Sequence, residues 1–349
     1  MIRSVLVCEA QVPFVRGGAE RHVDGLLAEL CRHGCRAQKV SIPFRSYPKE
    51  ELVAQTALWR LLDLTEFNYE PVDLVIATKF PTYFVRHPNK VTWLFHQYRA
   101  IYDLAGTPWS EFTNEERDVN LRKKLIDLDT EVLAESKRLF SNARNTARRL
   151  ELYNGLTAEP LYHPPPLAGR LTPGRYDDYV LSVGRLELTK RVDLIVRAIA
   201  RTDRGVRLVV AGSGSQRPQV EKLANDLGVA DRVTFAGEID DEQLVALYAN
   251  ALAVVFPPFD EDYGYVTLEA FLSRKPVITT SDSGGPLEFV GDGVSGFVVE
   301  PEAEALAAAI ARVAADRALA RRLGDCGFDR ASAISWSGVV ERLLGGAPQ

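Results

Sequence analysis

The sequence predicts an α/β protein of two domains, each built on a parallel β-sheet. Short runs of β-branched residues alternate with longer amphipathic stretches, which is the pattern of repeated βαβ units. The chain has 349 residues, which is more than one compact core usually holds. Residues 164–175 are rich in proline and lack a periodic pattern, so they are the predicted linker between the domains.

The N-terminal domain is predicted to span residues 1–163. Its expected elements, in chain order, are a strand at Ser4–Val7, a helix at Ala19–His33, strands at Val72–Ala77 and Val91–Phe95, and a helical stretch over residues 114–150 that contains a short strand at 139–142. Gly34 ends the first helix, and Pro71 marks the start of the next strand. This order of elements is that of a Rossmann-like domain.

The C-terminal domain is predicted over residues 176–334, and a tail follows at 335–349. Its expected elements, in chain order, are strand Tyr179–Val183, helix Lys190–Thr202, strand Arg207–Ala211, a helix that ends at Leu227, strands Val233–Ala236, Val254–Pro257 and Pro276–Thr279, and helix Ala303–Leu323. The last helix is rich in alanine and arginine, which favour helices. The alternation again predicts a Rossmann-like domain.

Composition and charge argue against two classes of function. The net charge of −5 disfavours a nucleic-acid binder, which is usually basic. No apolar run is long enough to span a membrane, and the N-terminal apolar residues reach Glu9 too soon for a signal peptide, so we expect a cytoplasmic protein. Cys31 and Cys35 lie one helical turn apart without a second pair that completes a zinc site, so all four cysteines are expected to be buried or half-buried thiols.

Residues that directly follow the C-terminal strands are the best candidates for ligand binding, because open parallel sheets bind ligands outside the carboxyl ends of their strands. Arg185 and Lys190 follow Tyr179–Val183 after the permissive Gly184, and their charged groups suit a diphosphate. Solvated surface charge is the alternative interpretation. Gly212-Ser213-Gly214 follows the next strand and predicts either an approach of backbone amides to a ligand or a simple tight turn.

The strongest local pattern lies in residues 259–270. Glu261 precedes a predicted helix, and Glu269 lies on that helix eight positions later. The amides of Gly264 and Tyr265 at the helix start make an anion site. A carboxylate on each side of a phosphate site suits a nucleotide-sugar, because one carboxylate can bind sugar hydroxyls and the other ribose hydroxyls.

Together these residues resemble the group-1 (family 4) retaining glycosyltransferases of the GT-B fold. The matching motifs, in chain order, are Gly17-Gly18-Ala19-Glu20, Val183-Gly184-Arg185 with Lys190, Gly212-Ser213-Gly214, Glu261 with Glu269, Pro276-Val277-Ile278, and Gly284-Gly285-Pro286 with Glu288. The resemblance covers nearly the whole chain. It implies two Rossmann-like domains that face each other across a cleft, with residues 335–349 crossing back towards the N-terminal domain.

The resemblance also implies roles for individual residues. Arg185 and Lys190 are similar to the pair that neutralises the departing diphosphate, Glu261 to the carboxylate on the donor sugar, and Glu269 to the carboxylate on the ribose. His96 resembles an active-site histidine near the transferred sugar. The remaining donor-site residues implied are Gly17, Gly18, Gly184, Gly212, Ser213, Gly214, Asp262, Tyr263, Gly264 and Tyr265. Asp262, Tyr263, Tyr265 and Arg191 depart from the usual family residues and leave the donor sugar open.

The implied activity is retaining, metal-independent hexosyl transfer from a UDP- or GDP-sugar to a glycan or lipid-linked glycan. No cofactor is expected, because the nucleotide-sugar is a substrate, and Asp260-Glu261-Asp262 is assigned to sugar contact rather than to a metal. A basic stretch over residues 137–149 predicts either peripheral contact with anionic lipid or a solvated helix face. The alternative function is a non-catalytic GT-B subunit that binds a nucleotide-sugar or a partner enzyme.

Overall fold

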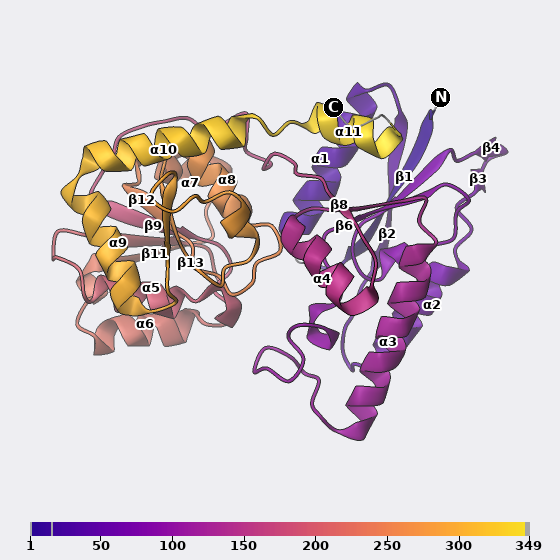
Figure 1. Ribbon diagram of the computed structural model, residues 1–349, viewed down its shortest axis with the longest axis horizontal. Coiled ribbons are helices and arrows are strands. Elements are labelled where there is room, and N and C mark those ends of the chain that lie inside the picture. The colour runs from indigo at the N-terminus through magenta and orange to yellow at the C-terminus, as the bar shows by residue number, and fades with distance from the viewer. Residues whose placement is uncertain (1, 15–16, 346–349) are drawn as a thin grey trace. The chain divides into compact units, whose positions relative to one another are not determined.

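The structure is a computed structural model that describes residues 2–14 and 17–345 (Figure 1). The chain divides into two compact units. The first unit holds the residues up to His163 together with those from Ser335 onward, and the second unit holds Pro164–Ile334. Each unit contains a six-stranded sheet with parallel pairing throughout, which confirms the predicted α/β class.

The sheet of the first unit has the strand order β2-β1-β5-β6-β7-β8. Its strands are β1 (Ser4–Gln11), β2 (Arg36–Pro43), β5 (Leu74–Ala77), β6 (Lys90–Leu94), β7 (Arg138–Ser141) and β8 (Glu159–Pro160). Its α-helices are α1 (Gly18–Arg32), α2 (Glu51–Leu61), α3 (Glu116–Ala134), α4 (Arg144–Asn154) and α11 (Trp336–Leu344). A short antiparallel hairpin, β3 (Glu66–Phe67) and β4 (Glu70–Pro71), stands outside this sheet.

Helices cover both faces of this sheet, and its strands β1, β5 and β6 are buried on both sides. Val5 and Val7 of β1 pack in the core formed with α1 and α11, whereas Leu6 and Cys8 pack in the core formed with α2, α3 and α4. This alternation is the period of two that a strand imposes on its side chains. The centre of the first β-strand, residues 5–8, is therefore apolar on both faces.

The C-terminal helix α11 packs in the first unit against α1. Trp336 at its start lies 5.8 Å from the ring of His22 and 5.6 Å from the ring of His163, measured between centroids. At its other end the Arg138 guanidinium donates hydrogen bonds to the carbonyl oxygens of Arg342 and Leu343, at 2.6 and 2.8 Å. A cation at a helix C-terminus satisfies carbonyls that lack an intrahelical partner and opposes the helix dipole.

The sheet of the second unit has the order β11-β10-β9-β12-β13-β14. Its strands are β9 (Tyr179–Val183), β10 (Arg207–Ala211), β11 (Val233–Gly237), β12 (Ala253–Val255), β13 (Val277–Thr280) and β14 (Gly296–Val299). Its helices are α5 (Val192–Ile199), α6 (Arg217–Asp226), α7 (Asp241–Asn250), α8 (Tyr265–Leu272), α9 (Ala303–Ala315) and α10 (Arg317–Ser332), with short 3-10 turns η3 (Leu188–Lys190) and η5 (Gly285–Glu288).

The structure corrects the predicted helix Ala303–Leu323, which is two helices. Helix α9 ends at Ala315, and Asp316 then caps α10 by accepting a hydrogen bond from the Leu319 N–H at 2.9 Å. Aspartate is favoured at the N-cap position because its side chain accepts a hydrogen bond from a backbone N–H that has no partner within the helix. The alanine and arginine content hides the break, since it favours helix on both sides.

The proline-rich segment 164–175 belongs to the second unit. Leu167 and Leu171 are buried, and Arg170 forms an ion pair with Asp241 of α7 at 3.1 Å. The Lys275 ammonium donates a hydrogen bond to the carbonyl oxygen of Arg175 at 2.6 Å. These contacts fix the segment on the surface of the second unit.

Two further expectations are settled by burial and hydropathy. Cys8 and Cys35 are buried, but Cys31 and Cys326 are exposed, so the expectation of burial is wrong for these two residues. Both lie on solvent-facing sides of α1 and α10. Among the described residues, no helix combines the length and the apolar character that a membrane crossing requires.

A buried carboxyl group lies in the first unit on α3. Asp129 is fully buried and accepts hydrogen bonds from the hydroxyls of Tyr83 and Tyr102, at 2.8 and 2.6 Å. Burial raises the pKa of Asp129 to about 7, because loss of water disfavours the charged form more than the two tyrosine hydrogen bonds favour it. The folded chain therefore holds this proton over a range where the unfolded chain has released it.

We expect the contribution of Asp129 to the free energy of unfolding to fall as the pH rises from about 4 to 7, because this group binds its proton more tightly in the folded state than in the unfolded state. Asp129→Asn keeps the shape and an acceptor for both tyrosines but cannot ionise. In urea unfolding, the free energy of unfolding of Asp129→Asn relative to that of wild type should increase by about 1–3 kcal/mol between pH 5 and pH 8. An advantage that stays constant with pH would contradict the assignment.

Candidate functional site

The predicted site residues of the second unit follow β9, β10 and β12. These strands are neighbours in the sheet and run parallel, so their carboxyl ends lie at the same edge. The residues that the sequence scatters over more than 80 positions therefore lie at one edge of the sheet.

The loop after β9 packs closely against the loop after β10. The Gly184 N–H donates to the Ala211 carbonyl oxygen at 3.0 Å, and the Leu186 N–H donates to the Ser213 carbonyl oxygen at 3.0 Å. A Cβ atom at Gly212 would lie 2.0 Å from the Gly184 carbonyl oxygen, and one at Gly214 would lie 2.4 Å from that of Leu186. The two glycines are thus required by the approach of two backbones.

Arg185 and Arg191 lie on the same connection between β9 and α5 but differ in their surroundings. Arg185 is exposed, and its guanidinium forms no hydrogen bond or ion pair with another residue in the described part of the chain. Arg191 instead donates five hydrogen bonds to neighbouring loops. Of these two arginines, Arg185 is therefore the one whose donors are available for an anion.

The segment that carries Glu261 is held by backbone hydrogen bonds to the loop after β13. The Asp260 N–H donates to the Asp282 carbonyl oxygen at 2.8 Å, and the Glu261 N–H donates to that of Ser283 at 2.9 Å. In return the Gly285 N–H donates to the Glu261 carbonyl oxygen at 2.7 Å. The glycine turn after β13, for which the sequence indicates only a loop and a helix start, thus also fixes the position of Glu261.

The Lys190 ammonium forms an ion pair with the Glu261 carboxylate. The two residues are separated by 71 positions in the sequence. Both side chains are half-buried, at 21% and 23% exposure, and the ammonium also lies 5.8 Å from the centre of the Phe256 ring. A partly desolvated pair of opposite charges is stronger than one on the open surface. The fold therefore brings a cation and a carboxylate together beside the exposed Arg185 loop.

Helix α8 begins directly after the loop of Glu261. Gly264 has φ of 83°, a left-handed conformation that lets the chain turn into the helix at Tyr265. Tyr263 is buried, and its ring packs 5.6 Å from that of Phe289. Asp262 is half-buried, and the backbone of residues 262 and 263 leaves no room for a side chain at Gly285. The loop is consequently a fixed part of the unit.

Glu269 lies on α8 and is buried, with 6% of its surface exposed. Its carboxylate accepts a hydrogen bond from the hydroxyl of Tyr248 at 2.8 Å. Tyr248 lies on α7 and is fully buried. Burial and the neighbouring Glu269 charge raise the pKa of Tyr248 well above its usual range, so its hydroxyl stays a donor. Tyr248 was not predicted from the sequence, because a tyrosine within a helical pattern is typical of a core residue.

The predicted residues of the first unit lie at the carboxyl edge of its own sheet. The Gly17 N–H donates to the Glu20 carboxylate at 2.8 Å, and Glu20 forms an ion pair with Lys79 at 3.2 Å. Gly18 begins α1. His96 follows β6, its carbonyl oxygen accepts a hydrogen bond from the Phe80 N–H at 3.4 Å, and its Nδ1 lies 2.8 Å from the Gln97 carbonyl oxygen. The loops after β1, β5 and β6 are linked in this way.

Glu20 belongs to the predicted motif at residues 17–20, but no role for its carboxylate or for the contact with Lys79 was predicted from the sequence. Burial alone would raise the pKa of Glu20, but the Lys79 ammonium and the Gly17 N–H outweigh it and hold the pKa below its usual range. Glu20 is therefore ionised and fixes both the start of α1 and the loop after β5. In the described residues, no group of three or more histidine, cysteine, aspartate or glutamate side chains is placed to hold a metal ion.

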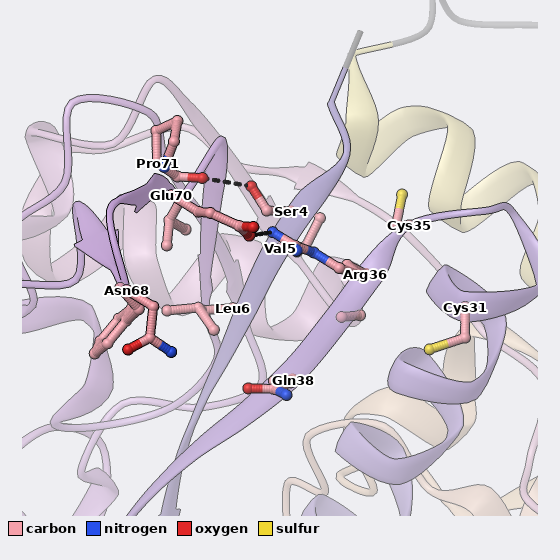
Figure 2. Close-up of a pocket in the computed structure, with 13 residues that line it drawn as sticks. Ser4, Val5, Leu6, Cys31, Cys35, Arg36, Gln38, Asn68, Glu70 and Pro71 are labelled. Atoms are coloured by element: carbon pink, nitrogen blue, oxygen red, sulfur yellow. Dashed lines mark hydrogen bonds and ion pairs between the residues drawn. The ribbon is translucent and has the colours of Figure 1, made fainter.

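A separate pocket of about 570 Å³ lies in the first unit between the hairpin and the amino ends of β1 and β2 (Figure 2). Glu70 and Arg36 form an ion pair across it, and the Ser4 hydroxyl donates to the Pro71 carbonyl oxygen at 2.9 Å. The amino ends of parallel strands lie at the edge of the sheet opposite to the carboxyl ends. This pocket is thus distinct from the residues predicted to bind a ligand.

Comparisons with known proteins identify the family that the sequence motifs resemble. The sequence model of a family described as "Glycosyl transferases group 1" matches residues 173–330. The chain is 32% identical over 332 residues to a D-inositol 3-phosphate glycosyltransferase of Geodermatophilus obscurus, covering 86% of this chain and 72% of that protein. It is 34% identical over 242 residues to the Nocardia farcinica enzyme of the same name, covering 62% and 53% of the two chains.

The chain spans about half the length of the Nocardia enzyme and of two further relatives with that name. Among solved structures, sucrose-phosphate synthase from Thermosynechococcus elongatus superposes with a TM-score of 0.78 at 20% identity, over 98% of this chain and 97% of that one. The Anabaena protein HepE in complex with UDP and glucose superposes with a TM-score of 0.73 at 16% identity, over 98% and 100%. At these identities the structural matches establish the GT-B fold alone.

Proposed function

The chain belongs to the group 1 glycosyltransferases, and from that premise we propose that it transfers a sugar from a nucleoside-diphosphate donor to a glycan acceptor with retention of configuration. The observation that carries the proposal is the Lys190–Glu261 ion pair beside the exposed Arg185. These three residues supply two cations and one carboxylate at one sheet edge. The two cations can neutralise a diphosphate, and the carboxylate can accept hydrogen bonds from sugar hydroxyls.

Different residues are proposed to bind the diphosphate, the sugar and the ribose of the donor. The guanidinium of Arg185 and the ammonium of Lys190 neutralise the diphosphate, together with the N–H groups at the start of α8. Glu261 accepts hydrogen bonds from sugar hydroxyls, and Glu269 accepts them from the ribose. The protein groups thus concentrate positive charge where the leaving group gains negative charge, which is the usual source of the largest rate effect.

The transfer step follows from this placement. An acceptor hydroxyl oxygen attacks the anomeric carbon on the face from which the diphosphate departs. The bond from the anomeric carbon to the phosphate oxygen breaks as the new glycosidic bond forms, and the departing phosphate takes the hydroxyl proton. The cations offset the developing charge, so no side-chain nucleophile and no metal ion enter the scheme. The donor-site roles of Gly17 and Gly18 and the active-site role of His96, all in the first unit, stay predictions from the resemblance.

Of the two donor classes, we propose a UDP-sugar rather than a GDP-sugar. HepE, which shares the fold, has been solved with UDP-glucose bound. For the acceptor, the names of the curated relatives indicate D-inositol 3-phosphate. An inositol phosphate therefore joins glycans and lipid-linked glycans in the acceptor panel.

The test is nucleoside-diphosphate release from a panel of UDP- and GDP-sugars, with and without each acceptor. We expect release with one donor class that rises at least about tenfold when the correct acceptor is added. NMR of the product should show the anomeric configuration of the donor. Tight donor binding without release under any condition would favour the non-catalytic subunit instead, and inversion of configuration would contradict the proposed step.

Tyr248 supplies a sharper prediction about the ribose side. Tyr248→Phe removes the hydrogen bond to Glu269 and leaves the ring in place. We expect the KM for the donor to rise by roughly 5- to 10-fold with little change in kcat, since a less well positioned Glu269 weakens the contact with the ribose equally in the ground state and in the transition state. Tyr179→Phe is the matched control, because Tyr179 donates to the Leu247 carbonyl oxygen at 2.7 Å and does not contact Glu269. Equal effects of the two substitutions would argue against the role of Glu269.

We also propose that the basic stretch over residues 137–149 contacts an anionic membrane surface. Within the basic stretch, Arg138 is used at the end of α11, and Arg149 is buried in an ion pair with Asp103 at 3.2 Å. Lys137, Arg144 and Arg148 stay exposed. Flotation with anionic liposomes at low salt tests whether these three cations suffice, and a protein that stays at the bottom of the gradient would exclude the contact.

A further inference from the structure

We infer that Arg191 is a positioning residue of the donor site, which it serves by fixing the loop that carries Glu261. The inference rests on the proposed function for its effect on turnover, but its structural part stands on contacts within the second unit. Arg191 lies next to Lys190 in the sequence, but the two side chains contact different residues. Lys190 contacts Glu261, whereas Arg191 holds the loops on either side of it.

The guanidinium of Arg191 joins the segments after β12 and β13. It donates to the carbonyl oxygens of Pro257 and Pro258, each at 2.8 Å. It donates also to both carboxylate oxygens of Asp282, at 2.8 and 2.7 Å, and to the Thr280 hydroxyl at 2.8 Å. A planar fork of fixed geometry can bind a carboxylate and two carbonyls at once, and an ammonium cannot.

These partners stand directly before the residues of the donor site. Pro257 and Pro258 lead into the loop of Glu261, and the carbonyl oxygen of Asp282 accepts the N–H of Asp260 at 2.8 Å. The bidentate contact with Asp282 therefore fixes the strand-like segment against which Glu261 lies. A shift in either segment would move the Glu261 carboxylate relative to Lys190.

The backbone of Arg191 adopts a left-handed turn that is unfavourable for a residue with a side chain. Its φ of 50° and ψ of 43° are left-handed, a conformation that costs roughly 1–2 kcal/mol for a residue with a Cβ atom. The same turn ends η3 and begins α5, so it aims Lys190 and Arg191 in different directions. A glycine would adopt this turn without strain, yet it would lack all five hydrogen bonds.

Charge gives Arg191 a second effect on the site. Burial alone would raise the pKa of Asp282, but the hydrogen bonds and charge of Arg191 and the Thr280 hydroxyl hold it below its usual range. Asp282 is therefore ionised. Without the guanidinium its charge would add to that of Glu261 and Asp262, beside a site that binds a diphosphate.

The test compares Arg191→Gly and Arg191→Lys with wild type in donor turnover and in hydrogen exchange of the loop. We expect both variants to lower kcat/KM for the donor by about 10- to 100-fold with a melting temperature close to wild type, and millimolar guanidinium ion to restore part of the activity of Arg191→Gly. The matched control is Arg201→Ala, which removes a surface ion pair with Glu304 in the same unit and should leave turnover unchanged.

Hydrogen exchange separates this inference from the proposed function. The amides of Asp260 and Glu261 should exchange at least about tenfold faster in Arg191→Gly than in wild type, whether or not the protein turns over a donor. Unchanged exchange and turnover in an active enzyme would overturn the inference alone. A wild type that turns over no donor would overturn the proposed function, while the exchange rates would still decide whether Arg191 positions the loop.

Discussion

Replacing Arg185 with alanine is expected to lower the kcat of sugar transfer by at least about 100-fold, with no loss of stability. The expectation follows from the contrast between two arginines on one loop. Arg185 is exposed, so its removal disturbs no packing, whereas its charge is proposed to act on the leaving diphosphate. The effect should appear in kcat because the charge on the departing phosphate develops as the bond breaks.

The measurement is steady-state release of the nucleoside diphosphate, together with the unfolding temperature of each variant. Arg204→Ala is the matched control, because Arg204 is also exposed and lies before β10, at the edge of the sheet opposite to the site. The control should retain full activity. Full activity in Arg185→Ala as well would remove Arg185 from the mechanism.

Glu261→Gln is expected to have the second large effect, a fall in kcat/KM of about 10- to 100-fold, which corresponds to the loss of one or two hydrogen bonds to a charged group. Glutamine keeps the shape of the side chain but removes the negative charge that Lys190 and the sugar hydroxyls contact. Because Lys190 loses its partner, the change also alters the cation next to the leaving group. The loss should therefore appear in both KM and kcat.

A donor that lacks one sugar hydroxyl tests most directly whether Glu261 binds that hydroxyl. If Glu261 binds that hydroxyl, the deoxy donor should be poor with wild type, and Glu261→Gln should add little further loss with it. Glu221→Gln is the matched control, since Glu221 forms an exposed ion pair with Arg217 on α6. Losses that multiply for every deoxy donor would place Glu261 outside the sugar site.

Local sequence patterns predicted the elements that present the site. Strands β9 and β10 have the predicted bounds, since a largely buried parallel strand has a mostly apolar sequence. Glu261 lies in a loop and Glu269 on the following helix, as the glycine between them indicates. By contrast, β2 is an edge strand with many exposed residues, and its sequence lacks the apolar run that would reveal it.

Contacts between distant segments were not predictable from such patterns. The Lys190–Glu261 ion pair depends on the order of β9 and β12 in the sheet, which no local pattern encodes. The hydrogen bond from Tyr248 to Glu269 joins two helices, and the left-handed turn at Arg191 divides a stretch with helical periodicity. The roles of Gly212 and Gly214 became clear only when the neighbouring backbone was placed.

The central claim is that the carboxyl edge of the second unit binds the diphosphate of a nucleotide-sugar. Calorimetric titration with a nucleoside diphosphate and with the matching monophosphate tests it without knowledge of the acceptor. We expect the diphosphate to bind at least about tenfold more tightly, and this advantage to disappear in Arg185→Ala, because the second phosphate is the group that the cations contact. Equal affinities of the two nucleotides for the wild type would contradict the account.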